Sequence, residues 1–166
     1  MKRGVLMKNG STLFLKAVVL GMGAAALALY IFAVPALVAS AADMRPEVAF
    51  FRYFALVGWY ATAIPFYFAL YRTFRLLMLI DRGMAFSELS VKALKWIKYC
   101  AAAVSILWAA GLPVVYHLAD VEDAPGIMLI GLVIAFVPIV IATFAAVLQR
   151  LLKQAVDIKS ENDSTI

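Results

Sequence analysis

The strongest constraint on this chain is a series of four apolar runs, each long enough to cross a lipid bilayer. A helix needs about 20 apolar residues to cross roughly 30 Å of hydrocarbon. Backbone groups in lipid must be hydrogen-bonded within the chain, so these runs are expected to be helices. The predicted spans are residues 17–42, 52–73, 97–118 and 126–148. The sequence therefore predicts an all-α fold, a four-helix transmembrane bundle.

The composition supports a membrane protein over a water-soluble one. Of the 166 residues, 66% are hydrophobic and 15% are charged, whereas a soluble domain has about 45–50% apolar and about 25% charged residues. No linker rich in Pro, Ser or Gly divides the chain. We therefore predict a single membrane domain over residues 1–158, followed by a polar tail over residues 159–166.

The basic residues predict the direction in which the chain crosses the membrane. With four spans, 13 of the 15 Lys and Arg residues lie on one side, and only Arg45 and Arg52 lie on the other. The positive-inside rule places both termini and the connection at 72–98 in the cytoplasm. The predicted location is the cytoplasmic (inner) membrane, with multiple spans. The two outer connections are too short to form a ligand-binding domain.

The first span has an alternative interpretation as a signal peptide. Basic residues precede it, and the "ASA" at residues 39–41 resembles a signal-peptidase site. Its 26 uncharged residues exceed the usual apolar region of about 7–15 residues in signal peptides, which favours a retained helix. Cleavage would leave three spans and an external N-terminus, and mass spectrometry would then find a mature N-terminus near Ala42.

The spans carry few groups that could perform chemistry. No Asp or Glu lies within any of the charge-free spans, His117 is the only histidine and Cys100 is the only cysteine. No P-loop, HExxH or GxSxG motif is present. We expect no catalytic, metal or cofactor site, no enzymatic activity and no direct binding of nucleic acid. The basic residues sit at the ends of the spans, which indicates membrane topology instead.

Three further sequence features concern helix packing within the membrane. Thr62, Ser105 and Thr143 are single hydroxyls within the spans, and we expect each to bond to the backbone of its own helix. Trp59, Tyr60 and Trp108 lie deep in the spans and are expected to pack between helices. A spacing of small residues that permits close helix contact occurs in the first span, at Gly21 and Ala25 and at Ala24 and Ala28.

The connection between the second and third spans carries clear helix boundary signals. Gly83 is a plausible stop for the second helix, because glycine accepts the left-handed conformation. Ser87 can cap the next helix, with Glu88 in its first turn. Phe86 and Val91 have the spacing of a hydrophobic staple. We therefore expect helices 2–4 to extend beyond the membrane into the cytoplasm.

These extensions contain the candidate interaction surface. Lys92, Lys95 and Lys98 cover an arc of about 120° on one helix, opposite an apolar side formed by Leu89, Ala93, Trp96 and Ile97. In the last helix, Leu148, Leu151, Leu152 and Ala155 form one stripe. The candidate partner or lipid surface comprises Arg72, Arg75, Lys92, Lys95, Lys98, Arg150 and Lys153. Both an anionic lipid surface and a docking surface for a cytoplasmic protein fit this pattern.

Three segments, residues 62–100, 109–134 and 146–166, resemble the YoaS-like family of uncharacterised bacterial membrane proteins. The most recognisable shared feature is the helix start at Phe86 and Ser87 after Gly83. The resemblance implies four membrane helices with no established activity, and it transfers no catalytic residue. Members are often encoded beside a small helix-turn-helix regulator of the Cro/CI type, which implies a cytoplasmic DNA-binding regulator as a partner.

The predicted function is a non-enzymatic regulatory or interaction protein that sequesters or signals to such a regulator. The alternative is a small permease, channel subunit or exporter of an apolar compound. The lipid bilayer itself is a predicted partner, and assembly into a homo-oligomer stays open.

Overall fold

The computed structural model describes residues 2–40 and 46–165, and every element within these ranges is a helix. The elements are α1 (Lys2–Ala28), the π-helical turn η1 (Leu29–Ala33), α2 (Val34–Ser40), α3 (Pro46–Asp81), α4 (Glu88–Val121) and α5 (Pro125–Ser164). Four of the helical segments are long and apolar enough to cross a membrane. The predicted all-α, four-helix architecture is confirmed.

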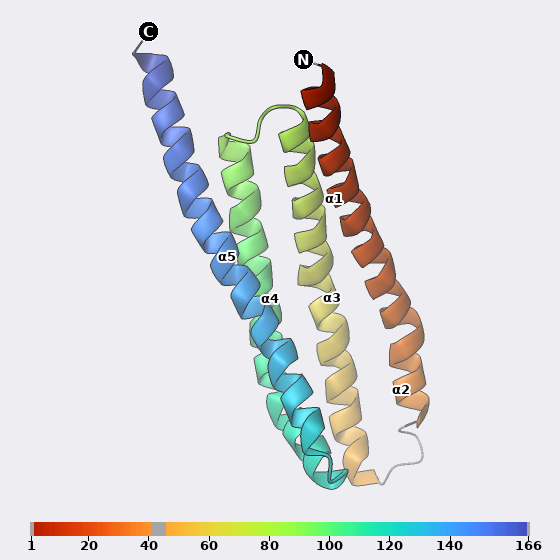
Figure 1. The fold of residues 1–166 in the computed structure, drawn as a ribbon. Coiled ribbons are helices and arrows are strands. Elements are labelled where there is room, and N and C mark those ends of the chain that lie inside the picture. Colours follow the sequence, from red (N-terminus) through yellow and green to blue (C-terminus); the bar gives the residue numbers. More distant parts are fainter. Residues whose placement is uncertain (1, 41–45, 166) are drawn as a thin grey trace.

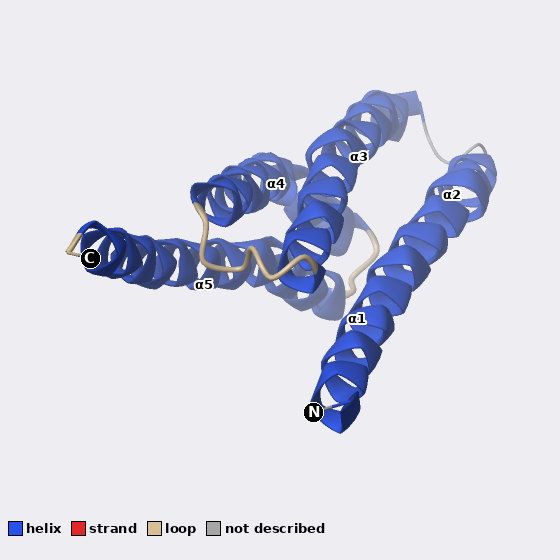
Figure 2. Cartoon of the chain, turned by 90° about the horizontal axis from the view of Figure 1, so that it is seen from above, coloured by secondary structure: helices blue, strands red, loops and turns tan. Residues whose placement is uncertain are grey.

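The helices lie side by side in the order α1, α3, α4, α5 (Figures 1 and 2). α4 contacts both α3 and α5, whereas α1 makes its main contact with α3. Both termini lie at one end of the molecule together with the α3–α4 loop, and the α4–α5 loop lies at the other end (Figure 1). We call the first of these the terminal end. An even number of spans brings both termini to the same side of a membrane, and the arrangement of the helices agrees with this.

The helices are longer than the predicted spans. α3 continues past residue 73 to Asp81, α4 begins at Glu88, and α5 continues through the segment predicted as a polar tail. The first helix also begins earlier than residue 17, since α1 starts at Lys2. The predicted extension of helices 2–4 beyond the spans is therefore present as continuous helix at the terminal end. Arg45, one of the two predicted outer basic residues, lies outside the described residues.

A π-helical turn interrupts the first membrane helix just before a proline. The backbone N–H of Val34 donates to the carbonyl of Leu29, five residues earlier. Pro35 follows directly, and it lacks the N–H that would bond to the carbonyl of Ile31. Wide turns of this kind adjust a helix where the regular hydrogen-bond ladder breaks. In contrast, α3, α4 and α5 continue through Pro65, Pro113 and Pro138 respectively.

The closest helix contact is between α4 and α5, and small residues form it. Gly131, Ala135 and Ala145 of α5 are buried. A Cβ atom on Gly131 would stand 2.7 Å from Cγ1 of Val115, so α4 approaches the backbone of α5 at this point. In lipid, helices associate through such close packing, because the hydrophobic effect does not drive the association of helices that are already in an apolar environment.

A hydroxyl also joins α4 to α5. The Ser105 Oγ is buried and donates to the carbonyl of Ala135, 3.1 Å away. The prediction that Ser105 bonds to its own helix is wrong, because Ser105 faces the α5 backbone at the close contact. The same prediction is confirmed for Thr62, which donates to the carbonyl of Trp59, and for Thr143, which donates to that of Ile139.

Tyrosine hydroxyl groups join the first membrane helix, through α1 and η1, to α3. Tyr67 Oη donates to the carbonyl of Gly23 over 3.0 Å, and Tyr30 Oη lies 3.2 Å from Thr62 Oγ1. The hydroxyl of Tyr60 donates to the Tyr30 carbonyl over 3.4 Å. Directional hydrogen bonds therefore attach the first membrane helix to one side of α3.

The small residues of α1 do not form a close contact. Gly21, Ala24, Ala25 and Ala28 are all exposed in this chain. Their spacing permits close packing, yet within the described residues the close small-residue contact lies between α4 and α5.

The aromatic residues predicted to pack between helices do so. The rings of Trp59 in α3 and Trp108 in α4 meet edge to face, with 5.7 Å between their centroids. Tyr60 lies against Tyr30 of η1, with 6.3 Å between the ring centroids. These contacts confirm the packing prediction for Trp59, Tyr60 and Trp108.

Candidate functional site

The α3–α4 loop begins with the predicted glycine stop. Gly83 has a φ of 72°, in the left-handed region that glycine adopts without strain. Its N–H donates to the carbonyl of Ile80 over 3.1 Å, and the N–H of Met84 donates to that of Leu79 over 2.9 Å. This pair of bonds is the Schellman motif, which satisfies carbonyls at a helix end. The prediction for Gly83 is confirmed.

The loop ends at the predicted helix cap. The Ser87 side chain accepts a hydrogen bond from the backbone N–H of Ser90 over 3.4 Å and donates to the Met84 carbonyl over 2.7 Å. Glu88 occupies the first turn of α4. Ser87 is therefore both the cap of α4 and a link to Met84 in the loop that follows α3.

Ser90 is a structural residue that the sequence analysis missed. Its side chain is 0% exposed, and its hydroxyl donates to the Met84 carbonyl over 3.1 Å. Ser90 stands where a capping box has Glu or Gln, and its hydroxyl bonds to the loop carbonyl and lies 3.4 Å from the hydroxyl of Ser87. The available signal was its position next to Val91 at the start of an otherwise apolar helix face.

The buried face of α4 differs from the predicted one. Val91, Ala93 and Leu94 are buried, whereas Leu89 and Trp96 are 52% and 46% exposed. The reason is that α4 packs between α3 and α5, so its buried surface faces two neighbours. The buried face therefore includes only part of the side predicted opposite the lysines.

The seven candidate cations fall into two groups. Arg72 and Lys98 are half-buried, and Lys98 Nζ donates to Oε1 of Gln149 in α5 over 2.9 Å. Five are exposed, namely Arg75, Lys92, Lys95, Arg150 and Lys153. Arg75 lies beside Tyr71, with its guanidinium carbon 6.0 Å from the ring centroid. The binding role of this set stays a prediction, and the exposed five are the members available to a partner.

An apolar groove of about 370 Å³ lies among α3, α4, α5 and the loop between α3 and α4. We call it the three-helix groove. Its lining residues are Leu76, Ile80, Ala85, Phe86, Leu94, Leu148, Leu151, Leu152 and Ala155. The predicted apolar stripe of the last helix is thus one side of this groove. Arg150 and Lys153, which are exposed, alternate with the stripe along α5.

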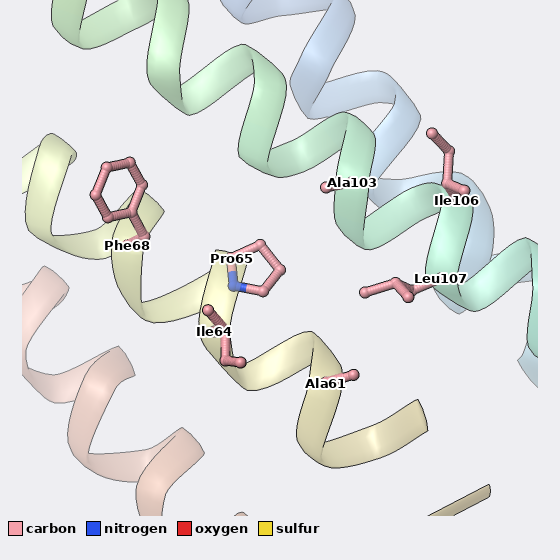
Figure 3. Close-up of a pocket in the computed structure, with 7 residues that line it drawn as sticks. All are labelled: Ala61, Ile64, Pro65, Phe68, Ala103, Ile106 and Leu107. Atoms are coloured by element: carbon pink, nitrogen blue, oxygen red, sulfur yellow. The ribbon is translucent and has the colours of Figure 1, made fainter. Parts of the chain in front are cut away.

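A second apolar groove, of about 550 Å³, lies between α3 and α4 at membrane depth. We call it the α3–α4 groove. Its lining residues are Ala61, Ile64, Pro65, Phe68, Ala103, Ile106 and Leu107. Figure 3 shows Ala61 and Pro65 of α3 and Ala103 and Leu107 of α4 projecting toward the space between the two helices. All seven of these described lining residues have apolar side chains.

An ion pair joins α1 to α3 near the terminal end. Lys16 of α1 bonds to the carboxylate of Asp81, the last residue of α3. Asp81 lies beyond the predicted span at 52–73. The hydrogen bond from Lys16 lowers the pKa of the Asp81 carboxyl below its ordinary value, and a hydrogen bond with Thr12 acts in the same direction. The Lys16 and Asp81 side chains are 21% and 30% exposed, and an ion pair that water still reaches stabilises only weakly.

The described residues therefore offer binding surfaces rather than an assembled reactive group. Cys100 is free and buried in α4. Within residues 2–40 and 46–165, no three His, Cys, Asp or Glu side chains are placed so that they could hold a metal ion. What the geometry provides is two apolar grooves, with cations near each of them.

The chain is a helical membrane protein, and comparison with known proteins agrees. Residues 36–166 match the family described as "Protein of unknown function (DUF2975)". The chain is also 56% identical over 160 residues to the "Uncharacterized membrane protein YoaS" of Bacillus subtilis (strain 168), covering 96% of this chain and all of that relative. No solved structure matches. The chain belongs to this family of uncharacterised membrane proteins, so the resemblance predicted from the sequence is confirmed.

Proposed function

We propose that this chain is a non-enzymatic regulatory protein of the cytoplasmic membrane that holds a cytoplasmic protein in the three-helix groove. The observation that carries the proposal is the position of the groove. Eight of its nine lining residues lie beyond the ends of the predicted spans, and Leu148 lies at a span end. Exposed apolar patches outside the bilayer commonly mark interaction sites.

The orientation of the chain is part of the proposal. The groove lies at the terminal end, together with both termini and the α3–α4 loop (Figure 1). The excess of Lys and Arg at this end supports a cytoplasmic position for it. Reporter fusions at the C-terminus test this directly: a fluorescent protein that folds only in the cytoplasm should be bright, and alkaline phosphatase should be inactive.

The shape of the groove suggests the part of the partner that would bind. A groove lined by aliphatic side chains from three helices suits the apolar face of an amphipathic helix. Arg150 and Lys153 stand exposed beside it, which favours acidic residues on the flank of that helix. A helix-turn-helix regulator, the partner class implied by the family resemblance, is built of short amphipathic helices. Binding at the membrane would hold such a regulator away from DNA.

The test is co-purification of the full-length chain with the helix-turn-helix regulator encoded beside it. Leu151 lines the groove and is 56% exposed, so Leu151→Glu should abolish retention of the regulator without disturbing the helix contacts. The matched control is Ile158→Glu, because Ile158 lies on the same helix, is 66% exposed and does not line the groove. Retention should be unchanged in this control.

Two results would reject the proposal. Retention of the regulator by Leu151→Glu at the wild-type level would show that the groove is not the docking site. Failure of the wild-type chain to retain a regulator, together with solute flux across proteoliposomes containing the purified chain, would instead support a permease, channel subunit or exporter. Reversing the charge of Lys92 and Lys95, both exposed on α4, tests whether the lysine face contributes.

A further inference from the structure

Arg72 has an unusual environment at the boundary of the predicted second span. Its guanidinium carbon lies 4.9 Å from the ring centroid of Phe68 and 5.4 Å from that of Trp96. The two rings themselves meet edge to face, with 5.6 Å between their centroids. Phe68 comes from α3 and Trp96 from α4, so the aromatic pair bridges the two helices and positions the cation between them. Contact with aromatic faces stabilises a guanidinium that is partly removed from water.

This cation has no anionic partner among the described residues. Its Nε atom is buried and without a hydrogen-bond partner, and no carboxylate of the described chain forms an ion pair with it. A charge withdrawn from water is costly unless an opposite charge or a hydrogen-bond acceptor compensates it. The site is therefore electrostatically incomplete in the protein alone, and the group that would complete it is an anion.

The α3–α4 groove continues directly from this cation. Phe68 both contacts Arg72 and lines the groove. Ala61, Phe68 and Arg72 are spaced by seven and four residues, which places them on one face of α3. The 11 residues from Ala61 to Arg72 correspond to about 16 Å along the helix. The groove and the cation thus form one elongated surface along α3.

α4 repeats this pattern in the opposite direction. Trp96, Ala103 and Leu107 are spaced by seven and four residues on one face of α4, and the last two line the groove (Figure 3). Trp96 lies at the predicted start of the third span, a depth that tryptophan prefers. The charged end of the surface therefore lies at headgroup depth, and the apolar part lies within the hydrocarbon.

We propose that this surface binds one anionic phospholipid, with its phosphate at Arg72 and one acyl chain in the α3–α4 groove. Arginine suits phosphate because its planar guanidinium offers several donors. Arg75 lies one turn further on and is exposed, which adds positive charge beside the headgroup and favours a lipid with net negative charge. The inference does not depend on the proposed docking of a regulator, because the three-helix groove shares no lining residue with this site.

The test is native mass spectrometry of the full-length chain in detergent, titrated with phosphatidylglycerol or phosphatidylcholine carrying the same acyl chains. One phosphatidylglycerol should bind more tightly than the rest. Arg72→Gln should weaken this binding by about tenfold or more, the loss expected for a hydrogen bond to a charged group. Arg82→Gln is the matched control, since it removes an exposed cation just beyond the end of the same helix, ten residues from Arg72, and should change binding little.

A second variant tests the groove without touching the cation. Ala103→Leu places a larger side chain in the groove and should also weaken phosphatidylglycerol binding, whereas Ala109→Leu, at an exposed position of α4 outside the lining, should not. Equal binding by wild type, Arg72→Gln and Ala103→Leu would overturn the proposal. Equal affinity for phosphatidylcholine and phosphatidylglycerol would overturn its claim of an anionic lipid. Full displacement by glycerol phosphate alone would show that the acyl chain contributes nothing.

Discussion

The α4–α5 contact and the α1–α3 contact join helices in two different ways. Between α4 and α5, Gly131, Ala135 and Ala145 let the backbones approach, and Ser105 bonds across the gap. Between α1 and α3, hydroxyl groups of large side chains reach across instead, as Tyr67 does to the Gly23 carbonyl. Small residues and close packing characterise the first contact, and hydrogen bonds from large side chains characterise the second.

This difference divides the molecule into a closely packed unit and a peripheral helix. α3, α4, α5 and the α3–α4 loop supply every described lining residue of the two grooves, and α1 supplies none of them. The family match begins at residue 36, so it covers these three helices and leaves α1 outside. We therefore expect substitutions at the α4–α5 contact to affect the whole fold, and substitutions at the α1–α3 contact to affect mainly the attachment of α1.

The largest effect is expected at the closest point between α4 and α5. Gly131→Ala places a Cβ atom 2.7 Å from Val115 Cγ1, and the overpacking should lower the free energy of unfolding by about 1–3 kcal/mol. Thermal unfolding in detergent measures the change. Gly111→Ala in α4 is the matched control, because its added Cβ meets nothing within 4 Å. An equal response of the two variants would contradict the close contact.

A smaller loss is expected from the hydroxyl that crosses the same contact. Ser105→Ala removes the bond to the Ala135 carbonyl and should cost about 1 kcal/mol, as interhelical hydrogen bonds in membranes do. Thr143→Val removes a hydroxyl that bonds only to its own helix at an exposed position, so it should unfold as the wild type does. The interhelical role of Ser105 is refuted if the two variants unfold alike.

A still smaller loss is expected at the α1–α3 contact. Tyr67→Phe keeps the ring and removes the bond to the Gly23 carbonyl, which should cost about 0.5 kcal/mol. Tyr116→Phe, on the exposed surface of α4, provides the comparison. Thermal unfolding of both proteins in the same detergent should show a shift for Tyr67→Phe alone. A shift larger than that of Ser105→Ala would reverse the ranking of the two contacts.

The smallest effect is expected from the ion pair, and it should depend on pH. Because the Lys16 hydrogen bond lowers the pKa of Asp81, the pair adds stability above the ordinary pKa of an aspartate, and this contribution is lost as the pH falls through the lowered pKa. Wild type should therefore unfold at a slightly higher temperature than Asp81→Asn at pH 7, and the difference should vanish in strong acid. Asp157→Asn, at an exposed site of α5, should match wild type throughout.

The sequence predicts the elements of this fold better than it predicts their contacts. The spans, the stop at Gly83 and the cap at Ser87 follow from length, conformational freedom and hydrogen bonding within a few residues. The contact made by Ser105 does not follow, because a membrane helix is apolar on every side and hydrophobicity cannot identify the face that meets another helix. Ser105 bonds to a carbonyl 30 residues away, a pairing that only the assembled helices define.

The two helix ends show the same limit locally. α3 ends at a glycine, which the sequence signals clearly, whereas α4 ends with Asp123 at a φ of 49°. Aspartate adopts this conformation more readily than most residues do. However, aspartate is also common at positions that are not helix ends. The bond from Ala124 N–H to the Ala119 carbonyl completes the turn, and the sequence carries no distinctive signal for it.

The length of α5 links the bilayer to the three-helix groove. Its 40 residues correspond to about 60 Å of helix, or about twice the thickness of the hydrocarbon. Leu151, Leu152 and Ala155 line the groove on the same uninterrupted helix that crosses the membrane. Membrane helices adjust to a thinner or thicker bilayer by tilting, and a tilt of about 10° moves a point about 30 Å along such a helix by about 5 Å. If α5 tilts relative to α3 and α4, the width of the groove changes with the thickness of the lipid around it.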